Sequence, residues 1–475
     1  MNQFPFVNAK TSFSPFARAI ATQEFAWLLI ALFGITTLGG IAGAPRLVNL
    51  LYPLEALLLG LFLYLRFPIL YLGLTWWLWI LSPLVRRLVD YRSAFTQPSP
   101  VLLAPILVSL ISGLTLLKCI PRMNQLGGLP YLLALSSICF TYALGLVNFS
   151  FLDATEQFLD LLIPLTFGFH IYTNWQLYPQ YKQNLRRVFV WAVIVMGGYG
   201  VFQFLTAPAW DAYWYVNADY VSGGQPEPFA IRVWSTLNSA GPFAGVMMSG
   251  LLILLDVPGP QKYLASGLGF MAFLLSQHRT SWLGWVLGIL TITGSSTPKR
   301  QIKLLITLGL LVLFVIFLAN LDLFSEVISS RFGSFLSLEE DGSGRVRREE
   351  YAEFLTPALS QIVGNGLGGL LHDSGILYSL LNFGWIALLI YLGGLFLPLL
   401  RLFQSKYAQQ DMFLIICRSI PLSILIQSAT VVSFLGVYGF LLWVITSYGI
   451  AGDKYYFNLE KNADYLGKIS IPQQE

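Results

Sequence analysis

Residues 302–319 read IKLLITLGLLVLFVIFLA, residues 374–400 read SGILYSLLNFGWIALLIYLGGLFLPLL, and a polar interval of residues 320–372 separates them. Both apolar runs are close to the ~20 residues that one helical crossing of a bilayer needs. The interval between them holds four arginines, an acidic run and one of the chain's three histidines. The pattern predicts a polar loop held between two membrane spans, and this loop is the first place to expect chemistry.

The composition of the whole chain agrees with membrane spans. Of its 475 residues, 56% are hydrophobic and only 11% are charged, and the mean hydropathy is +0.66. A soluble domain carries about 25% charged residues, so the composition predicts an all-α polytopic membrane protein. The net charge of +4 gives no reason to expect a nucleic-acid partner. Cys119, Cys139 and Cys417 lie in apolar runs and are expected to be packing residues, not a disulfide framework or a metal site.

Apolar runs of spanning length predict a transmembrane helix bundle of about 12–14 crossings. The expected spans lie near residues 25–43, 47–65, 67–83, 101–118, 130–149, 157–173, 188–206, 233–255, 262–277, 280–294, 302–319, 374–400, 412–429 and 431–449. The first span ends in small residues, like a signal peptide, but the many spans after it favour a retained helix.

Lys and Arg residues in short loops predict the orientation of these spans. If the N-terminus is cytoplasmic, most basic loops fall on the cytoplasmic side, including those at Lys118, Lys182 and Lys299. The resulting organisation is a cytoplasmic segment 1–24, transmembrane helices in 25–319, an extracytoplasmic catalytic loop 320–373 with an amphipathic helix, transmembrane helices in 374–450, and a cytoplasmic tail 451–475.

Three arginines contradict this orientation. Arg86, Arg87 and Arg92 would lie outside, against the trend that places positive charge inside. Either the span near 67–83 is misassigned, or these arginines face an anionic ligand, and the sequence leaves both explanations open.

Two further basic positions adjoin the spans on the predicted outer side. Arg232 opens a span in IRVWSTLNSAGPFAGVMM, where hydroxyl and amide side chains follow it, and His278-Arg279 interrupts a long apolar run in FLLSQHRTSWLGWVLG. Cations at a membrane edge are costly and tend to mark function. The alternatives are an arginine that snorkels at a helix end and a turn that simply needs polar residues.

The loop itself predicts a helix. Ser343 is a suitable N-cap for a helix that begins near Arg345, and an apolar stripe follows at helical spacing. Its first turn would bring Arg345, Arg347 and Arg348 to a helix N-terminus, an arrangement that favours an anion such as phosphate. The alternative is a solvated charged turn, and the glycines at 364–369 predict a turn into the next span.

His372 stands where the loop meets the last long apolar run, beside Asp373 and Ser374. A histidine there can accept a proton from a hydroxyl near neutral pH, or it can serve as a cap or interface residue. The acidic run at 339–341 can bind a cation, but a solvated turn is the preferred interpretation. No metal and no cofactor are expected.

The order of these motifs resembles that of the O-antigen ligase and O-antigen polymerase superfamily of bacterial membrane proteins. The matching stretches are Arg232 to Ala244, HRTSWLGWVLG from His278, SGRVRREEY from Ser343, GNGLGG from Gly364, and His372 to Ile376. The resemblance covers roughly residues 190–400. It departs from the family at His278, which replaces a serine, and the spacing to Tyr351 fits Arg347 about as well as Arg345.

The resemblance implies a glycosyltransferase on the periplasmic side of the bacterial inner membrane. Such an enzyme moves a glycan from an undecaprenyl-diphosphate carrier to a sugar hydroxyl on a glycan or lipid-linked acceptor, as a ligase or a polymerase of lipopolysaccharide or exopolysaccharide. Membrane lipid, a flippase and a chain-length regulator are the implied partners. The implied catalytic residues are His372, Arg232 and Arg345, and the implied substrate-binding residues are Arg279, Arg347, Arg348 and His278.

Two other function classes fit a polytopic chain. A secondary transporter of a small solute such as bicarbonate would place ionisable residues near mid-membrane on discontinuous helices, whereas the charges here gather at the outer surface, with Glu55 as an exception. A scaffold subunit of an export complex would leave the outer arginines unconstrained. Convergence of Arg232, a loop arginine and His372 on one site would favour the enzyme.

Overall fold

The computed structural model describes residues 22–218, 223–319, 342–369 and 371–469, so Arg331 and the acidic run at 339–341 lie outside the described residues. Within these ranges the chain is helical, and the sole strand-like pairing is an isolated antiparallel bridge between Gly224 and Ile231. The predicted all-α fold class is confirmed.

The helices follow one another along the chain. Their bounds are α2 Gln23–Gly43, α3 Pro45–Arg66, α4 Pro68–Arg92, η1 Pro100–Leu102, α5 Leu103–Leu110, α6 Gly113–Cys119, η2 Ile120–Arg122, α7 Met123–Leu126, α8 Leu129–Asn148, α9 Phe151–Thr173, η3 Trp175–Leu177, α10 Tyr178–Thr206, α11 Ala209–Asn217, α12 Ala240–Leu254, α13 Gln261–Leu275, α14 Arg279–Gly294, α15 Pro298–Ala319, α17 Gly342–Ser360, α18 Gly375–Gln404, η4 Lys406–Gln409, α19 Met412–Leu425, η5 Ile426–Ala429 and α20 Gly436–Ile469.

Eight stretches of the described residues are long and apolar enough to cross a membrane. They are α2, α3, α4, the run Pro100–Leu126, α8, the run Trp175–Thr206, α18 and the run Met412–Ala429. The other predicted spans coincide with α9, α12, α13, α14, α15 and α20. The chain is therefore a multi-pass membrane protein built as a helical bundle.

Two predicted spans are interrupted. The span near 101–118 divides into α5 and α6, because the Ser112 hydroxyl donates to the Ser109 carbonyl at 2.6 Å and competes with the helical ladder. Helix α18 is opened at Gly384, whose φ of +64° suits glycine. The backbone of the glycine-rich segment fills this break: Asn365 N–H donates to Leu381 O at 2.8 Å. That segment is therefore a bracing element of α18, and not only the predicted turn.

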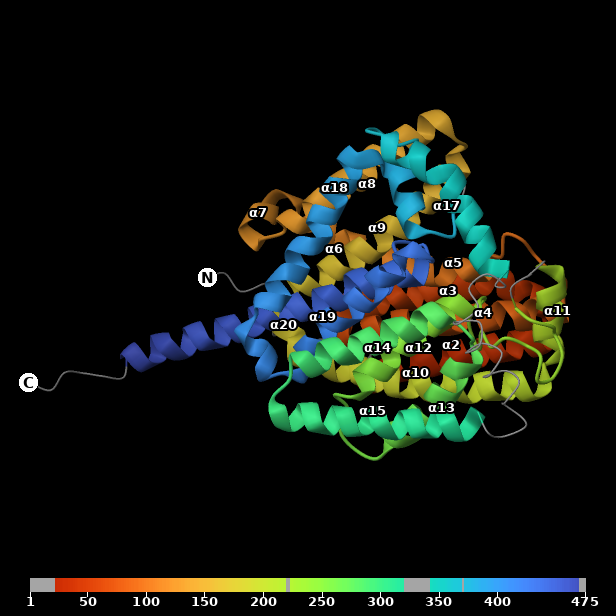
Figure 1. Cartoon of the computed structure of the whole chain (residues 1–475), viewed down its shortest axis with the longest axis horizontal. Helices are drawn as coiled ribbons and strands as arrows, with labels where there is room; N and C mark the ends of the chain where they lie inside the picture. Colours follow the sequence, from red (N-terminus) through yellow and green to blue (C-terminus); the bar gives the residue numbers. More distant parts are fainter. Residues whose placement is uncertain (1–21, 219–222, 320–341, 370, 470–475) are drawn as a thin grey trace, which may run out of the picture.

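The long helices run between two ends of the bundle. In Figure 1, α11 lies at the right-hand end and the C-terminal part of α20 projects from the left. We call the end that holds Lys182 and Asp411 the basic end, and the end that holds Arg232 and His278 the site end. Helices α10, α12, α19 and α20 join the two ends, so a residue's place along these helices determines its end.

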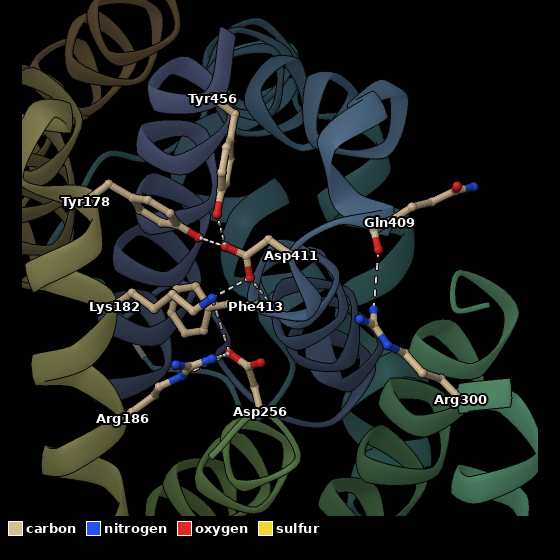
Figure 2. A network of polar contacts seen from close by, with 9 residues as sticks. All are labelled: Tyr178, Lys182, Arg186, Asp256, Arg300, Gln409, Asp411, Phe413 and Tyr456. Carbon is tan, nitrogen blue, oxygen red and sulfur yellow. Dashed lines mark hydrogen bonds and ion pairs between the residues drawn. The ribbon is translucent and has the colours of Figure 1, made fainter. Parts of the chain in front are cut away.

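An ion-pair network closes the basic end (Figure 2). Asp411 precedes α19 and accepts hydrogen bonds from Lys182 at 2.5 Å, Tyr178 at 2.8 Å, the Phe413 amide at 2.9 Å and Tyr456 at 3.0 Å. Lys182 also lies 3.7 Å from Asp256, to which Arg186 donates at 2.9 Å. Burial by itself raises the pKa of Asp411, but the hydrogen bond and charge of Lys182 and the tyrosine and amide donors outweigh it and hold this pKa below its ordinary value.

Candidate functional site

Arg232 lies in an extended segment and not at the start of a helix. The sequence predicted a span from residue 233, but α12 begins at Ala240. Arg232 follows the bridge residue Ile231, and its backbone N–H donates to Gly223 O at 2.8 Å. Its guanidinium Nε donates to Ser276 O at 2.7 Å. The half-buried guanidinium is therefore fixed against the turn between α13 and α14.

A buried ion pair holds this extended segment in place. Arg87 and Asp211 lie 2.8 Å apart and both side chains are fully buried. Arg87 also donates to Ser235 O at 2.5 Å, and Gln203 Oε1 accepts from the backbone N–H groups of Trp234 at 3.0 Å and Ser235 at 2.8 Å. Ser235 has a φ of +52°, an uncommon conformation for a non-glycine residue. We call these contacts the Arg87 brace, and they explain why the helix cannot start before Ala240.

Ion pairs account for two of the three arginines that contradict the predicted orientation, Arg86 and Arg87. Arg87 sits near the end of α4 and binds a carboxylate of α11. Helix α4 covers the predicted span near 67–83 and extends further, to Arg92. Arg86 lies 3.3 Å from Asp90 on its own helix. Internal carboxylates, not an external ligand, therefore balance these two charges.

His278 occupies the turn before α14 and is almost fully buried. Gln427 Nε2 donates to Ser423 O at 2.8 Å, so Gln427 Oε1 accepts the Ser281 hydroxyl, also at 2.8 Å. The Ser281 oxygen then accepts Nδ1–H of His278 at 2.8 Å, which leaves the lone pair on Nε2 facing Gly241. This chain of hydrogen bonds selects one tautomer of the imidazole.

The charges around His278 locate three arginines in one place. Burial and, in decreasing order, the positive charges of Arg232, Arg347 and Arg279 together lower the pKa of His278 to about 3. These arginines come from the extended segment, from α17 and from the first residue of α14. The site end thus concentrates three guanidinium groups around a neutral imidazole, and we call Arg232, Arg279, Arg347 and His278 the arginine cluster.

Helix α17 carries the rest of the site on one face. It begins at Gly342, so Ser343 lies inside the helix and not at the predicted N-cap. Arg347, Glu350, Tyr351 and Phe354 follow at the i, i+3, i+4 and i+7 spacing that shares a helix face. Tyr351 bonds to the Ser374 hydroxyl at 2.6 Å and to Ala429 O at 3.0 Å. This face is therefore turned toward the bundle.

His372 lies against that face. Its Nδ1 is 2.8 Å from Glu350 Oε1, and the side chains of His372 and Glu350 are 9% and 16% exposed. The same oxygen accepts the Asp373 backbone N–H at 3.3 Å, and the Phe354 ring contacts the imidazole at 4.9 Å between centroids. A carboxylate that accepts Nδ1–H leaves the lone pair on Nε2, where a base needs it.

The structure distinguishes the three loop arginines. Arg347 is half-buried, and its Nε is buried with no hydrogen-bond partner among the described residues. Arg345, one of the predicted catalytic residues, is 73% exposed and lies 3.8 Å from Glu349 one turn along its own helix. Arg348, predicted to bind substrate, is exposed as well. The structure thus brings together Arg347 with the predicted Arg232, Arg279 and His278.

Sequence reasoning missed three groups of residues. Glu350 could have been predicted from the sequence, because it lies one turn after Arg347 and so shares its helix face. The pairs Arg87 with Asp211 and Ser281 with Gln427 join segments far apart in the chain. Arg87 stood out in the sequence, but no local signal predicted either pairing. Within the described residues no three His, Cys, Asp or Glu side chains lie close enough together to hold a metal ion.

The arrangement suits a strongly anionic ligand next to a base. Guanidinium groups bind phosphate-like oxygens through paired donors, and a neutral His278 adds an uncharged partner among them. The His372–Glu350 pair, one helical turn from Arg347, supplies a base oriented by a carboxylate. No family model and no curated protein sequence matches this chain.

Proposed function

We propose that this protein transfers a glycan from an undecaprenyl-diphosphate carrier to a hydroxyl acceptor at the outer face of a bacterial inner membrane. One observation carries the proposal: the charges of three arginines from separate parts of the chain act on His278, and the helix that supplies Arg347 also orients His372. The motif resemblance, which covers these same residues, supports it.

The orientation rests on the distribution of charge. The basic end gathers Lys182 and Arg186, and positively charged loops favour the cytoplasmic side. The site end, at the opposite ends of the same helices, then faces the periplasm, where lipid-linked glycans are used.

The chemistry follows from the positions of these groups. The acceptor oxygen forms a bond to the anomeric carbon of the donor while the bond from that carbon to the diphosphate oxygen breaks with its electron pair. Guanidinium groups of Arg232, Arg279 and Arg347 neutralise the charge that develops on the leaving diphosphate. The acceptor proton passes to Nε2 of His372, and Glu350 stabilises the imidazolium that results. Arg347 takes the role that the sequence had given to Arg345.

The test is a single-enzyme reconstitution. Purified protein in liposomes receives a fluorescent undecaprenyl-diphosphate oligosaccharide, and release of lipid diphosphate is measured for wild type, Arg232→Ala and His372→Ala. We expect both variants to remain folded and to lose turnover, and the size of the product to distinguish ligase from polymerase. Turnover that survives in both variants would refute the proposed site.

One feature favours a transporter as a second candidate. Helix α18 is broken at Gly384, and discontinuous helices line the substrate sites of many transporters. However, the backbone of residues 361–366 fills this break, with Trp385 N–H donating to Gln361 O at 3.1 Å. Solute uptake into the same liposomes, without any turnover of a lipid-linked donor, would establish this second function.

A further inference from the structure

A long groove opens on the side of the bundle formed by α2, α3, α4 and α10. Its volume is about 1150 Å³, which exceeds the ~300–1,000 Å³ of most small-molecule pockets. None of the three arginines of the cluster lines it. The groove is therefore a separate feature from the candidate site.

Most of the groove has the character of a bilayer interior. Aromatic and aliphatic side chains line it, among them Trp27, Phe33, Trp77 and Trp191. Along α4 the lining runs from Pro68 to Val85, about 25 Å at 1.5 Å per residue. This approaches the ~30 Å thickness of the hydrocarbon core, so the groove suits a ligand with long apolar chains.

The lining at the basic end is polar and positively charged. Arg66 closes α3 there, and Gln180, Gln183, Asn184 and Arg187 come from the first turns of α10. Arg66 and Arg187 are exposed, and among the described residues no acidic side chain lines the groove. Asn184 Nδ2 is buried without a hydrogen-bond partner among the described residues. This end of the groove offers donors and positive charge to an anion.

Neighbouring cations on α10 are already neutralised. Lys182 and Arg186 pair with Asp411 and Asp256 in the network of Figure 2. Arg187, the next residue after Arg186, instead lines the groove. In the sequence, residues 1–21, which precede the groove residue Gln23, contain Lys10 and Arg18 and no acidic residue. The groove therefore joins an apolar channel to a net positive end.

We propose that this groove is a binding site for an anionic phospholipid, with the phosphate headgroup at Arg66 and Arg187 and the acyl chains along α2 and α4. The two arginines attract the headgroup, and the Asn184 amide donates a hydrogen bond to it. The lipid fills the space between α2 and the bundle. Helix α2 buries few of its own residues against the protein, which leaves room for a lipid beside it.

The test measures which lipids stay with the protein. Wild type is placed in nanodiscs of phosphatidylethanolamine and phosphatidylglycerol, released into mild detergent, and its retained lipids are quantified by native mass spectrometry. We expect phosphatidylglycerol to be enriched over the bulk ratio. Because a basic residue near an anionic surface contributes about fivefold in binding, Arg66→Gln and Arg187→Gln should each reduce the enrichment by about that factor. Arg46→Gln, exposed at the other end of α3, should leave it unchanged.

A second pair of variants tests the apolar part. Gly34 lines the groove and Gly39 does not, and a Cβ atom added at either position meets no protein atom within 4 Å. Gly34→Phe should displace the retained lipid, whereas Gly39→Phe on the same helix should not. The proposal is overturned if wild type retains lipid at the bulk ratio, if the arginine variants behave like Arg46→Gln, or if added undecaprenyl phosphate displaces phosphatidylglycerol from the groove. The measurement needs no enzymatic activity, so it stands apart from the proposed function.

Discussion

Arg347 and Arg345 lie two residues apart on α17, and their environments predict opposite consequences of substitution. Arg347 is half-buried, has a buried Nε and acts on the pKa of His278, whereas Arg345 is 73% exposed beside Glu349. Loss of one group that stabilises developing negative charge typically lowers kcat by ~10²–10³. Exposed helix pairs contribute only ~0.3–0.5 kcal/mol. We therefore expect Arg347→Ala to lose at least ~100-fold in turnover and Arg345→Ala to lose less than about twofold.

A second assay tests the same geometry without catalysis. The chain has three histidines, so ¹⁵N-histidine labelling gives few resonances to assign. Arg347→Ala should raise the pKa of His278, because one of the three charges that lower it is gone, and Arg345→Ala should leave this pKa unchanged. An added lipid diphosphate should also raise it, because the ligand neutralises the cluster.

The thermal stability of the two variants completes the comparison. Removal of Arg347 takes one like charge out of the cluster, so Arg347→Ala should melt no lower than wild type in detergent. Arg347→Lys keeps the charge but loses the paired donors, and it should fall between the alanine variant and wild type in turnover. Equal activity of the two alanine variants, or an unchanged His278 pKa in both, would refute the assignment of Arg347 to the site.

Three further variants probe other contacts of the site. Glu350→Gln should lower kcat, since an amide stabilises the His372 imidazolium less than a carboxylate does. His278 has a pKa of about 3 in the folded protein, whereas a histidine in the unfolded chain has its ordinary pKa of ~6.5. Between these values the unfolded chain binds more protons than the folded protein, so the free energy of unfolding should fall as the pH drops from about 6.5 towards 3. The melting temperature of His278→Gln should therefore depend less on pH across this range than that of wild type. Arg87→Ala leaves Asp211 buried without its partner and should lower the melting temperature of the protein. Fluorescence-detected size-exclusion chromatography of heated samples can measure this temperature.

Local sequence signals were enough for the helices. Apolar runs of spanning length gave nearly every helix of the bundle, and the polar interval correctly separated α15 from α18. The exceptions are informative. The run before Leu254 reads as apolar from residue 233, yet its first residues are extended, because Gln203 and Arg87 bind their backbone groups from distant helices.

The candidate site could be predicted only in part from the sequence, again because contacts between distant segments decide the rest. The sequence marked the polar positions Arg232, His278 and the loop arginines, because charge in an apolar context is visible locally. It could not select Arg347 over Arg345, since both fit the motif spacing. The choice depends on which face of α17 packs on the bundle, and Tyr351 fixes that face through Ser374 and Ala429, which are distant in the chain.

The arginine cluster also requires support from outside itself. Three guanidinium groups around an imidazole repel one another, and the Arg87 brace fixes the backbone of Trp234 and Ser235 through groups that are not part of the cluster. Because the brace binds backbone atoms and not the Arg232 side chain, the segment can keep its shape when the charge of the cluster changes. A diphosphate would then meet arginines already in position, which limits the reorganisation that lowers catalytic power. Loss of the brace should therefore reduce turnover even at saturating donor.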